Sequence, residues 1–397
     1  MSKKTESVLL LAITCFWFAG YIHIPYQTPY LTAAGITASA IGTIVGAYGV
    51  VQMVLRLPVG VMADRAGHHK PIVMLGCVLS AAACAVRFLL PDGTGFLIGN
   101  MISGCASSTW ISFMVLFSTY YSRQEQQAAT SRAIMACNLG MCIAFLFGTC
   151  FYSATSMRFL CAAGACGGIL GTLLASAVQE KRQDASAAAA HPGTVSTKIP
   201  VRELLRVCTD RRLILFSLLA LIQQGIQMAT AMSFTTQILK DLGAPAGLIG
   251  GASIFYMVAA VGSARFAGTA LCARRGARFY IPLVFLLVAI YCILVPRVGN
   301  VAVIFLLQAL PGMSNGILLS YLTSESMQGV PEEKKSTAMG FFQAVYAVGM
   351  SVFPAVVGVV AEHVNVAAGY AFLAAAALLG MTAALLYYHH TGVKATK

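Results

Sequence analysis

Long apolar runs, separated by short polar segments, occupy almost the whole chain. A helix needs about 20 apolar residues to cross the hydrocarbon core of a bilayer, and most of these runs reach that length. The pattern therefore predicts an all-α membrane protein with 12 transmembrane helices. The predicted spans are residues 8–30, 39–62, 70–90, 94–120, 127–150, 157–178, 212–238, 246–271, 279–296, 300–323, 335–360 and 366–388.

The composition excludes a soluble protein. Hydrophobic residues make up 58% of the 397 residues and charged residues only 10%, and the mean hydropathy is +0.79. This leaves too little polar surface for a water-soluble chain of this length. The first apolar run is too long for the core of a signal peptide and has no small-residue cleavage site, so we expect it to remain as the first span.

Basic residues outnumber acidic ones by 26 to 13. They are scattered between apolar runs and form no single basic domain, so nucleic acid is not an expected partner. Their placement predicts the topology instead, because Lys and Arg stay on the cytoplasmic side of a membrane. With the N-terminus inside, 20 of the 26 basic residues lie in cytoplasmic segments. We therefore expect a multi-pass protein of a bacterial-type inner membrane, with both termini in the cytoplasm.

The longest polar interruption covers residues 179–211 and divides the chain into two six-span halves, residues 1–178 and 212–397. Its Ala-rich and charged composition cannot bury a core and predicts a cytoplasmic linker, with a short amphipathic helix over residues 201–207. The halves match faintly at an offset of 209 residues, as internal repeats would. The matching pairs are Arg56 with Arg265, Arg65 with Arg274, Gly67 with Gly276, Gly140 with Gly349, and Met141 with Met350.

The polar turn between the second and third spans reads Gly60-x3-Asp64-Arg65-x-Gly67-x2-Lys70. This pattern resembles the signature loop of the major facilitator superfamily, and the 12 spans, the basic central linker and the internal termini are similar to that family along essentially the whole chain. The resemblance implies two pseudo-symmetric six-helix bundles that face each other across a central cavity. It also implies a small-molecule substrate bound near the midplane and access that alternates between the two sides. We expect a monomer in the lipid bilayer.

Asp64 has a specific expected partner. The eleventh span begins near Lys335-Ser336-Thr337, where unpaired amide groups and the positive end of the helix dipole favour a carboxylate. A bond between the halves at this point would latch the cytoplasmic side in the outward-open state, a role that the resemblance also implies. The alternative is that Asp64 caps a local turn. The residues to which we assign gating are Gly60, Asp64, Arg65, Gly67, Lys70 and Arg56.

Three arginines lie within predicted spans, where a charge must face the protein interior or a partner. Arg56 and Arg265 lie eight or nine residues before their loops and either brace the gate or bind an anionic substrate. An arginine placed like Arg265 on the eighth span resembles one used by organic-anion branches of the family. Arg87 is four residues from the extracellular turn that contains Asp92, so we expect it to snorkel or to pair with Asp92.

No acidic residue lies in the middle of a predicted span, which disfavours binding of a cation. His23 on the first span is the plausible intramembrane group for a coupling proton, although a lone His on an apolar helix is often a hydrogen-bonded packing residue. Other polar and aromatic side chains lie on spans that the resemblance places around the cavity. Each is a candidate substrate ligand or, alternatively, a hydrogen-bond partner of a neighbouring helix. The substrate-binding candidates are Tyr21, His23, Tyr26, Gln27, Asn100, Asn138, Gln223, Gln227, Arg265, Asn315, Gln343 and Tyr346.

These features predict a secondary active transporter that moves a small polar or anionic organic solute by alternating access, through symport or exchange. The alternatives are drug or metabolite efflux by proton antiport and, in another class, a membrane receptor or sensor on a transporter scaffold. Two patterns that the family's proton-driven drug exporters carry are degraded. The arginine of Arg-x3-Gly in the fourth span is replaced by Asn100 before Gly104, and the fifth span lacks the Gly-Pro pair.

We expect neither an enzyme nor a cofactor or metal site. No span carries Asp, His and Glu residues with catalytic or metal-ligand spacing, and no Gly-x4-Gly-Lys loop indicates direct use of ATP. Eight of the 12 cysteines lie well within apolar runs, where we expect small packing residues.

Overall fold

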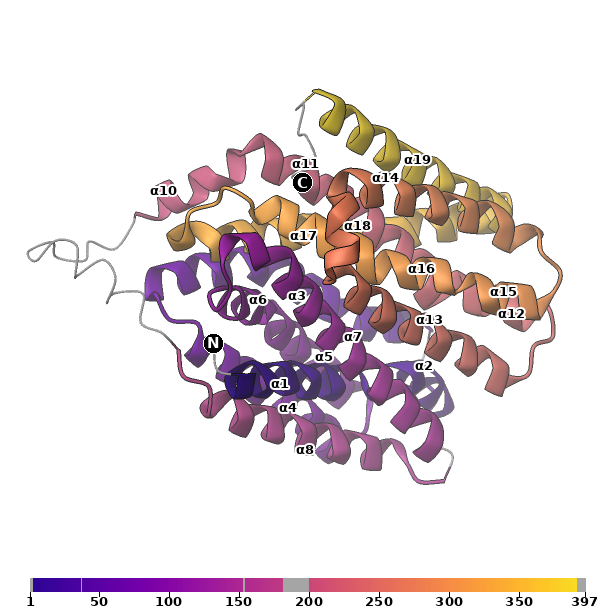
Figure 1. The fold of residues 1–397 in the computed structure, drawn as a ribbon. Helices are drawn as coiled ribbons and strands as arrows, with labels where there is room; N and C mark the ends of the chain where they lie inside the picture. The colour runs from indigo at the N-terminus through magenta and orange to yellow at the C-terminus, as the bar shows by residue number, and fades with distance from the viewer. Residues whose placement is uncertain (1–2, 37, 153, 181–199, 391–397) are drawn as a thin grey trace, which may run out of the picture. The chain divides into compact units, whose positions relative to one another are not determined.

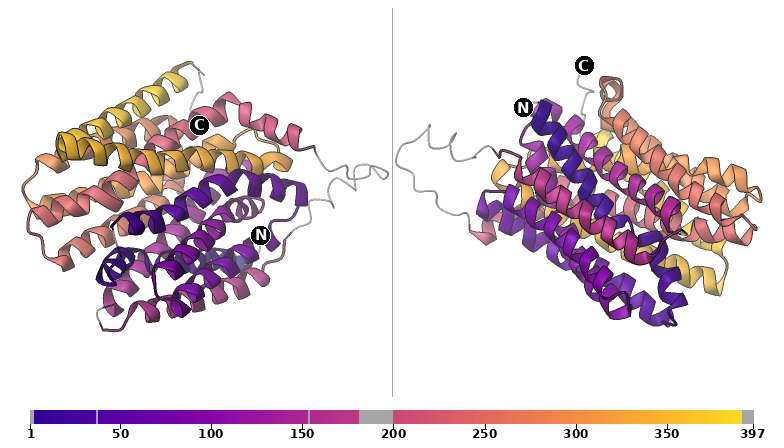
Figure 2. Two further views of the ribbon diagram at one scale, coloured as in Figure 1. Left: turned by 180° about the vertical axis from the view of Figure 1, so that it is seen from behind. Right: turned by 90° about the horizontal axis from the view of Figure 1, so that it is seen from below.

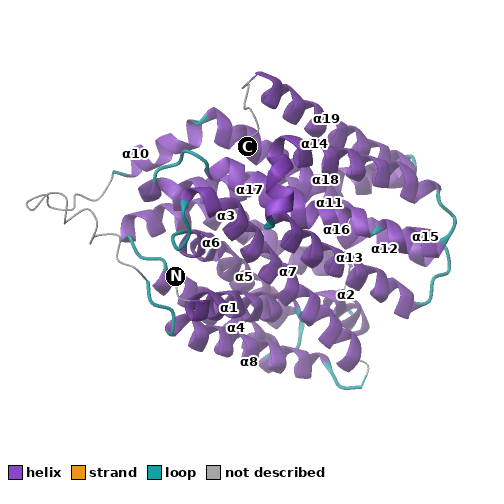
Figure 3. Cartoon of the chain, in the orientation of Figure 1, coloured by secondary structure: helices purple, strands orange, loops and turns teal. Residues whose placement is uncertain are grey.

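The computed structural model describes residues 3–36, 38–152, 154–180 and 200–390, and every regular element in these ranges is helical (Figures 1 and 3). Twelve helical segments are long and apolar enough to cross a membrane. The prediction of an all-helical protein with 12 spans is therefore confirmed. Most of the predicted linker, residues 181–199, lies outside the described ranges.

The first six spans comprise eight helices: α1 (Lys3–Tyr21), α2 (Ile24–Ala33), α3 (Ala38–Ala66), α4 (Lys70–Leu89), α5 (Gly93–Ser108), α6 (Trp110–Ser118), α7 (Gln126–Phe151) and α8 (Met157–Ser176). A short turn, η1 (Arg123–Glu125), precedes α7. In the region predicted as an amphipathic helix, the structure has α10 (Val201–Leu205) and then η2 (Arg206–Thr209).

The last six spans begin at α11 (Arg211–Ala229). They continue through η3 (Thr230–Phe234), α12 (Thr235–Asp241), α13 (Ala246–Ala267), α14 (Ala270–Leu294), η4 (Val295–Arg297), α15 (Val301–Leu307), α16 (Ala309–Met313), η5 (Ser314–Leu318), α17 (Leu319–Met327), η6 (Glu332–Lys334), α18 (Lys335–His363) and α19 (Val366–His390). Among the helices that pack together are α4 with α5 and α8, and α14 with α19 (Figure 2).

Residue contacts divide the chain into two compact units. Unit 1 contains residues 1–122, 150–214 and 327–344, and unit 2 contains residues 123–149, 215–326 and 345–397. Each unit therefore includes helices from both sequence halves: the start of the eleventh span belongs to unit 1, and the fifth span belongs to unit 2. The division of the sequence at residues 179–211 into two six-span bundles stays a prediction.

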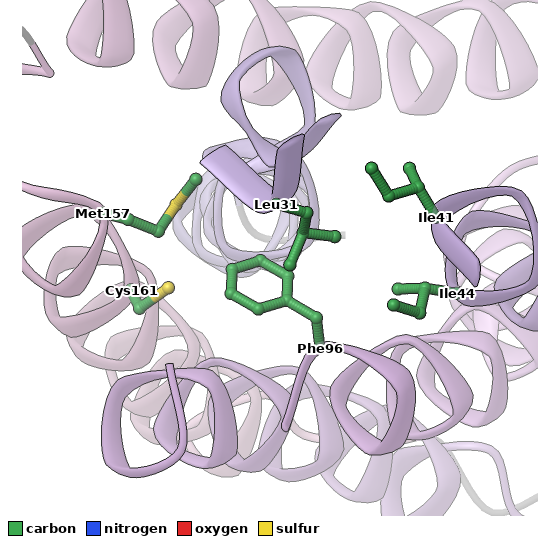
Figure 4. Close-up of a cluster of buried hydrophobic side chains, with 6 residues drawn as sticks. All are labelled: Leu31, Ile41, Ile44, Phe96, Met157 and Cys161. Carbon is green, nitrogen blue, oxygen red and sulfur yellow. The ribbon is translucent and has the colours of Figure 1, made fainter. Parts of the chain in front are cut away.

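A buried apolar cluster holds α2, α3, α5 and α8 of unit 1 together (Figure 4). Its members are Leu31, Ile41, Ile44, Phe96, Met157 and Cys161, and the rings of Tyr26 and Tyr30 pack against it. Cys161 acts here as a small apolar side chain, as expected. Cys166 is another of the eight cysteines expected to be packing residues, and for it the expectation is wrong, because it is exposed on α8.

The first, fourth, seventh and tenth spans are interrupted helices. The first breaks between α1 and α2, at Ile22 and His23, and the fourth breaks at Thr109, between α5 and α6. The seventh and tenth contain π-helical turns, η3 and η5. The offset of 209 residues found in the sequence carries Ile22 onto Ala231 in η3 and Thr109 onto Leu318 in η5. The internal repeat is therefore visible in the backbone, and such interruptions are common at functional sites.

Gly276 accounts for the largest difference between a predicted and an observed span. The sequence predicts a ninth span from residue 279, whereas α14 begins at Ala270. Gly276 has φ 63° and ψ −172°, a conformation that glycine adopts at little cost. Its break separates a short helical turn, which carries Arg274 and Arg275, from the long apolar helix.

Candidate functional site

Asp64 binds the start of the eleventh span. Its carboxylate lies near the end of α3 and accepts hydrogen bonds from the backbone N of Ser336 at 2.9 Å, the backbone N of Thr337 at 2.6 Å and the Thr337 hydroxyl at 2.6 Å. The first amides of a helix have no partner within the helix, and its dipole favours an anion there. The contact expected from the sequence is present, and the alternative of a cap on a local turn is wrong.

Two glycines allow α3 and α18 to approach closely beside this contact. A Cβ atom on Gly60 would lie 2.3 Å from the Ser336 carbonyl oxygen, and one on Gly340 would lie 2.7 Å from the Arg56 carbonyl oxygen. Neither distance is sterically possible, and both obstructing atoms belong to the backbone. The crossing therefore requires glycine at both positions.

Arg56 binds the same helix as Asp64. It is buried, with 2% of its surface exposed. Its Nη1 donates to the Gln343 carbonyl oxygen of α18 at 2.8 Å, and its Nη2 contacts the Gln52 side chain. The sequence left open whether Arg56 braces the gate or binds an anionic substrate. These contacts with α3 and α18 favour bracing. The Gln343 side chain is also buried, and its Oε1 has no hydrogen-bond partner.

The rest of the motif forms a second carboxylate contact, which the sequence did not predict. Gly67 ends α3 with φ 66°, and the following segment turns into α4. Glu180 accepts hydrogen bonds from the backbone N of His69 at 2.6 Å and of Lys70 at 3.1 Å, so it caps α4 as Asp64 caps α18. Lys70 also donates from Nζ to the Ser176 carbonyl oxygen at 2.7 Å. Arg65 is exposed.

His69 lies between the second and third spans and is 4% exposed. Burial lowers the pKa of its imidazole below the usual value, and the nearby Glu180 carboxylate opposes that effect only in part. Its Nδ1 has no hydrogen-bond partner. A neutral imidazole therefore fits this position better than a charged one.

Arg87 is the centre of a buried polar cluster in unit 1. It is fully buried, and its Nη2 donates to Asn100 Oδ1 at 2.7 Å and to Ser103 Oγ at 2.8 Å. The expectation that Arg87 snorkels or pairs with Asp92 is therefore wrong, and Asp92 instead caps α5 through Gly95 N at 2.8 Å. A Cβ atom on Gly99 would lie 2.8 Å from the Arg87 side chain, so glycine makes room for the guanidinium group.

The charge of Arg87 has no acidic partner among the described residues. Its Nε and Nη1 have no hydrogen-bond partner, although the Cys84 thiol lies nearby. Asn100 is fixed by a second bond, from its Nδ2 to the Ile44 carbonyl oxygen at 2.7 Å. His23, at the break in the first span, lies beside Arg87 and Asn100, is 2% exposed, and leaves Nδ1 without a hydrogen-bond partner.

The other candidates on the first span lie on either side of this break. The Tyr21 ring contacts the Trp17 ring at 5.4 Å between centroids, and the Tyr26 ring stacks on Tyr152 at 4.3 Å. Gln27 is buried, and its Oε1 has no hydrogen-bond partner. Tyr26 is therefore held by packing, whereas Gln27 retains an unused acceptor.

Unit 2 contains its own buried polar cluster, around the π-helical turn η5. Asn315 donates from Nδ2 to Asn138 Oδ1 at 2.7 Å. Gln223 donates from Nε2 to Gln227 Oε1 and to Ser314 Oγ, each at 3.3 Å. Gln223 Oε1 and Asn138 Nδ2 have no hydrogen-bond partner. Ser314, on the turn itself, was not among the predicted site residues.

A pocket of about 380 Å³ lies at the end of the seventh span that follows η3. Its lining residues are Ser233, Phe234, Thr236, Gln237, Lys240 and Ile249. Thr235, between two of these residues, points elsewhere and contacts the Tyr291 and Tyr370 hydroxyls at 2.7 and 2.8 Å. The seventh span therefore has one hydroxyl fixed inside unit 2 and several polar groups around a pocket.

The 12 predicted substrate-binding residues are divided between the units. Tyr21, His23, Tyr26, Gln27, Asn100 and Gln343 lie in unit 1, and Asn138, Gln223, Gln227, Arg265, Asn315 and Tyr346 lie in unit 2. Arg265 is exposed, whereas Tyr346 is 7% exposed. The structure brings His23 and Asn100 together in unit 1, and Gln223 with Gln227 and Asn138 with Asn315 in unit 2. Their roles in substrate binding stay predictions.

No group of three or more His, Cys, Asp or Glu residues in the described part of the chain could hold a metal ion.

Comparison with known proteins identifies the family. The protein-family model described as Major Facilitator Superfamily matches residues 9–354 and 228–396 of this chain. The inner membrane transport protein YajR of Escherichia coli (strain K12) is 26% identical over 129 residues, which are 32% of this chain and only 28% of that relative. The human organic anion transporter MFSD10 (TETRAN) has a TM-score of 0.74 and 16% identity, over 96% of this chain and 99% of that chain, which shows a shared fold.

The family model covers nearly the whole chain, and the 12 spans and the Asp64 contact agree with it. The chain belongs to the major facilitator superfamily of membrane transporters.

Proposed function

We propose that this membrane transporter carries a small organic anion by alternating access, through symport or exchange. The proposal rests on the buried Arg87, whose hydrogen bonds to described residues go to neutral side chains and which leaves two nitrogens without hydrogen-bond partners there. An unpaired buried charge is costly, and an anionic ligand would compensate it. The structural relative MFSD10 is an organic anion transporter by name, which supports the same class of substrate.

Buried amide side chains offer further hydrogen-bonding groups to a polar solute. Gln27 in unit 1 and Gln223 and Asn138 in unit 2 are buried and each keeps one polar atom without a partner. Buried polar atoms are normally hydrogen-bonded, so such exceptions require an explanation. Within unit 1, which holds both Arg87 and Gln27, we assign the unpartnered Gln27 oxygen to the solute, with the charge at Arg87 selecting anions and the Gln27 amide contributing orientation.

Asp64 is the proposed gate. Its three hydrogen bonds join the second span to the eleventh, which belong to different sequence halves. We assign this contact to the outward-open state and expect it to break when the transporter opens to the cytoplasm. Arg56 strengthens the same crossing through Gln343. The distribution of basic residues supports a cytoplasmic position for this contact and for both termini, in an inner membrane.

A proton is the proposed coupling ion if transport is active. His23 on the first span is buried and lies beside Arg87, so its protonation would place a second positive charge beside the guanidinium group. An anion bound at Arg87 would favour that protonation. Proton antiport with an exported drug is the second candidate. It is disfavoured for a cationic drug because no acidic residue lies in the middle of a predicted span.

Ligand binding by the purified protein tests this proposal. Anionic, neutral and cationic solutes of similar size are compared for their effect on thermal stability, because a ligand of the folded state raises it in proportion to affinity. Carboxylates or phosphate esters are expected to stabilise the protein, and Arg87→Gln to abolish the effect while Arg158→Gln, at an exposed position, retains it. Stabilisation by cations alone would contradict the proposal.

A further inference from the structure

A groove of about 510 Å³ lies between α13, α14 and the tenth span, within unit 2. Its size is in the range of small-molecule sites, about 300–1,000 Å³. Its walls are mostly apolar, with Phe266 and Ala259 from α13, Leu283 from α14, and Met313 and Ile317 from the tenth span. The proposed transport site does not use any of these residues.

The walls of the groove offer almost nothing to a polar solute. Ser263 contributes a hydroxyl, but this donor is already directed to the Gly312 and Ala260 carbonyl oxygens, at 3.2 Å each. The other hydroxyl belongs to Tyr280, which lies close to the Cys272 thiol. Gly262 leaves open space, because a Cβ atom there would have no heavy atom within 4 Å. The groove therefore fits a flexible apolar group better than a hydrogen-bonding one.

One end of the groove carries a positive charge. Arg275 lines it, is exposed, and has no hydrogen bond or ion pair with a described residue. Its guanidinium carbon lies 4.8 Å from the centre of the Phe279 ring, so a cation–π contact orients it. The backbone break at Gly276 places this arginine outside the long helix that forms the wall.

The apolar groove and the charge of Arg275 lie at different positions along the membrane spans. The groove-lining residues of α13 lie within the eighth span, and Leu283 lies within the ninth. Arg275 lies near the start of the ninth span, next to Arg274 and close to Arg278. Clusters of arginine at the end of a span attract anionic lipid headgroups. An apolar groove below such a charge matches an anionic headgroup with an attached acyl chain.

We propose that this groove binds one anionic phospholipid, with its phosphate on Arg275 and an acyl chain along α13 and α14. The charge of Arg275, which forms no ion pair with a described acidic residue, gives the headgroup preference. Gly262 provides the space for the chain. Occupation would stabilise the packing of the eighth, ninth and tenth spans, and so regulate a unit that also carries the Asn138 and Asn315 contact.

Native mass spectrometry of the purified full chain tests the proposal, with phosphatidylglycerol and phosphatidylcholine of identical acyl chains added in turn. One phosphatidylglycerol is expected to bind with higher affinity than phosphatidylcholine. Arg275→Gln should weaken it about fivefold, the effect of one arginine near a lipid surface, and Arg275→Lys should largely preserve it. Gly262→Leu, which fills the groove, should weaken both lipids. Arg274→Gln is the matched control, because Arg274 does not line the groove.

Equal affinity for the two lipids in the wild-type protein would overturn the proposal. An equal loss of phosphatidylglycerol affinity in Arg274→Gln and Arg275→Gln would also overturn it, since the effect would then come from the overall positive charge and not from the groove. Glycerol 3-phosphate is tested as a competitor of phosphatidylglycerol. If it displaces bound phosphatidylglycerol as effectively as added phospholipid does, the site binds a free phosphate and not a lipid. Thermal unfolding of each variant without lipid verifies that it is folded.

Discussion

Thr337 binds Asp64 through two atoms, its backbone N and its hydroxyl, each 2.6 Å from the same carboxylate oxygen. Ser336 N binds the other oxygen at 2.9 Å, so the carboxylate satisfies two of the free amides at the start of α18. The two helices come from different halves of the sequence, so this contact joins residues that are far apart along the chain, Asp64 and Ser336 being separated by 272 positions.

Asp64→Asn should weaken the α3–α18 contact while keeping its shape, because an amide oxygen accepts hydrogen bonds less strongly than a carboxylate. Hydrogen bonds to a charged group contribute about 1.5–3 kcal/mol, so protection of the Ser336 and Thr337 amides should fall roughly tenfold or more. Hydrogen exchange measures this loss. Arg158→Gln, at an exposed position on α8, should leave the protection unchanged, and equal protection in Asp64→Asn would exclude the latch.

Gly60→Ala should destabilise the protein by about 1–3 kcal/mol, the usual cost of overpacking. The added Cβ atom would meet the Ser336 carbonyl oxygen at 2.3 Å, and backbone cannot move away as a side chain can. Gly46→Ala on the same helix is the matched control, because its Cβ atom would have no heavy atom within 4 Å. Chemical unfolding in detergent compares the two variants; equal stabilities would show that α3 and α18 do not need to approach this closely.

His69 should make the protein less stable in mild acid. Burial lowers the pKa of the folded-state imidazole, while the unfolded chain has a pKa near 6.5. The unfolded state therefore binds a proton first, and stability should be constant above about pH 6.5 and decrease as the pH falls below it. His69→Gln should reduce this pH dependence in thermal unfolding. His363→Gln, at an exposed position, should retain it, and a wild-type slope in His69→Gln would remove His69 as the cause.

Asn315→Ala should affect transport more than stability. It removes the 2.7 Å bond to Asn138, and hydrogen bonds between membrane helices contribute only about 0.6 kcal/mol on average. If these amides bind the solute, the loss of binding free energy for the solute should be larger than this small loss of folding stability. Substrate affinity and unfolding midpoints are measured on the same preparation. A double mutant of Asn138 and Asn315 then shows whether the two residues act as one unit.

The spans could be predicted because they depend on local features of the sequence, and the Asp64 contact, which joins residues 272 and 273 positions apart, could be predicted because its turn resembles a family signature. Runs of apolar residues indicate membrane helices, and an acid in the signature turn needs helix amides nearby. The surroundings of Arg87 could not be predicted from its distance to the turn. The direction of its side chain depends on the fourth span, where Asn100 and Ser103 accept its hydrogen bonds and Gly99 leaves room for it.

Glu180 and the π-helical turns were missed for similar reasons. Glu180 reaches the start of α4 only after the chain has passed through four spans, the third to the sixth, so nothing local marks the contact. The π-helical turn η5 changes the hydrogen-bond register of a helix without a distinctive residue. The repeat offset of 209 residues was the one available signal, because it relates the turn to the break at Thr109.

The central claim is that the buried charge of Arg87 selects an anionic solute. Uptake of a stabilising organic anion into proteoliposomes tests it most directly, with wild-type protein, Arg87→Gln and Arg158→Gln reconstituted at equal folded amounts. Wild type and Arg158→Gln are expected to accumulate or exchange the anion, and Arg87→Gln to lose at least nine-tenths of the rate, since an unpaired buried charge and its ligand contribute more than about 1.4 kcal/mol. Undiminished anion uptake by folded Arg87→Gln would contradict the account.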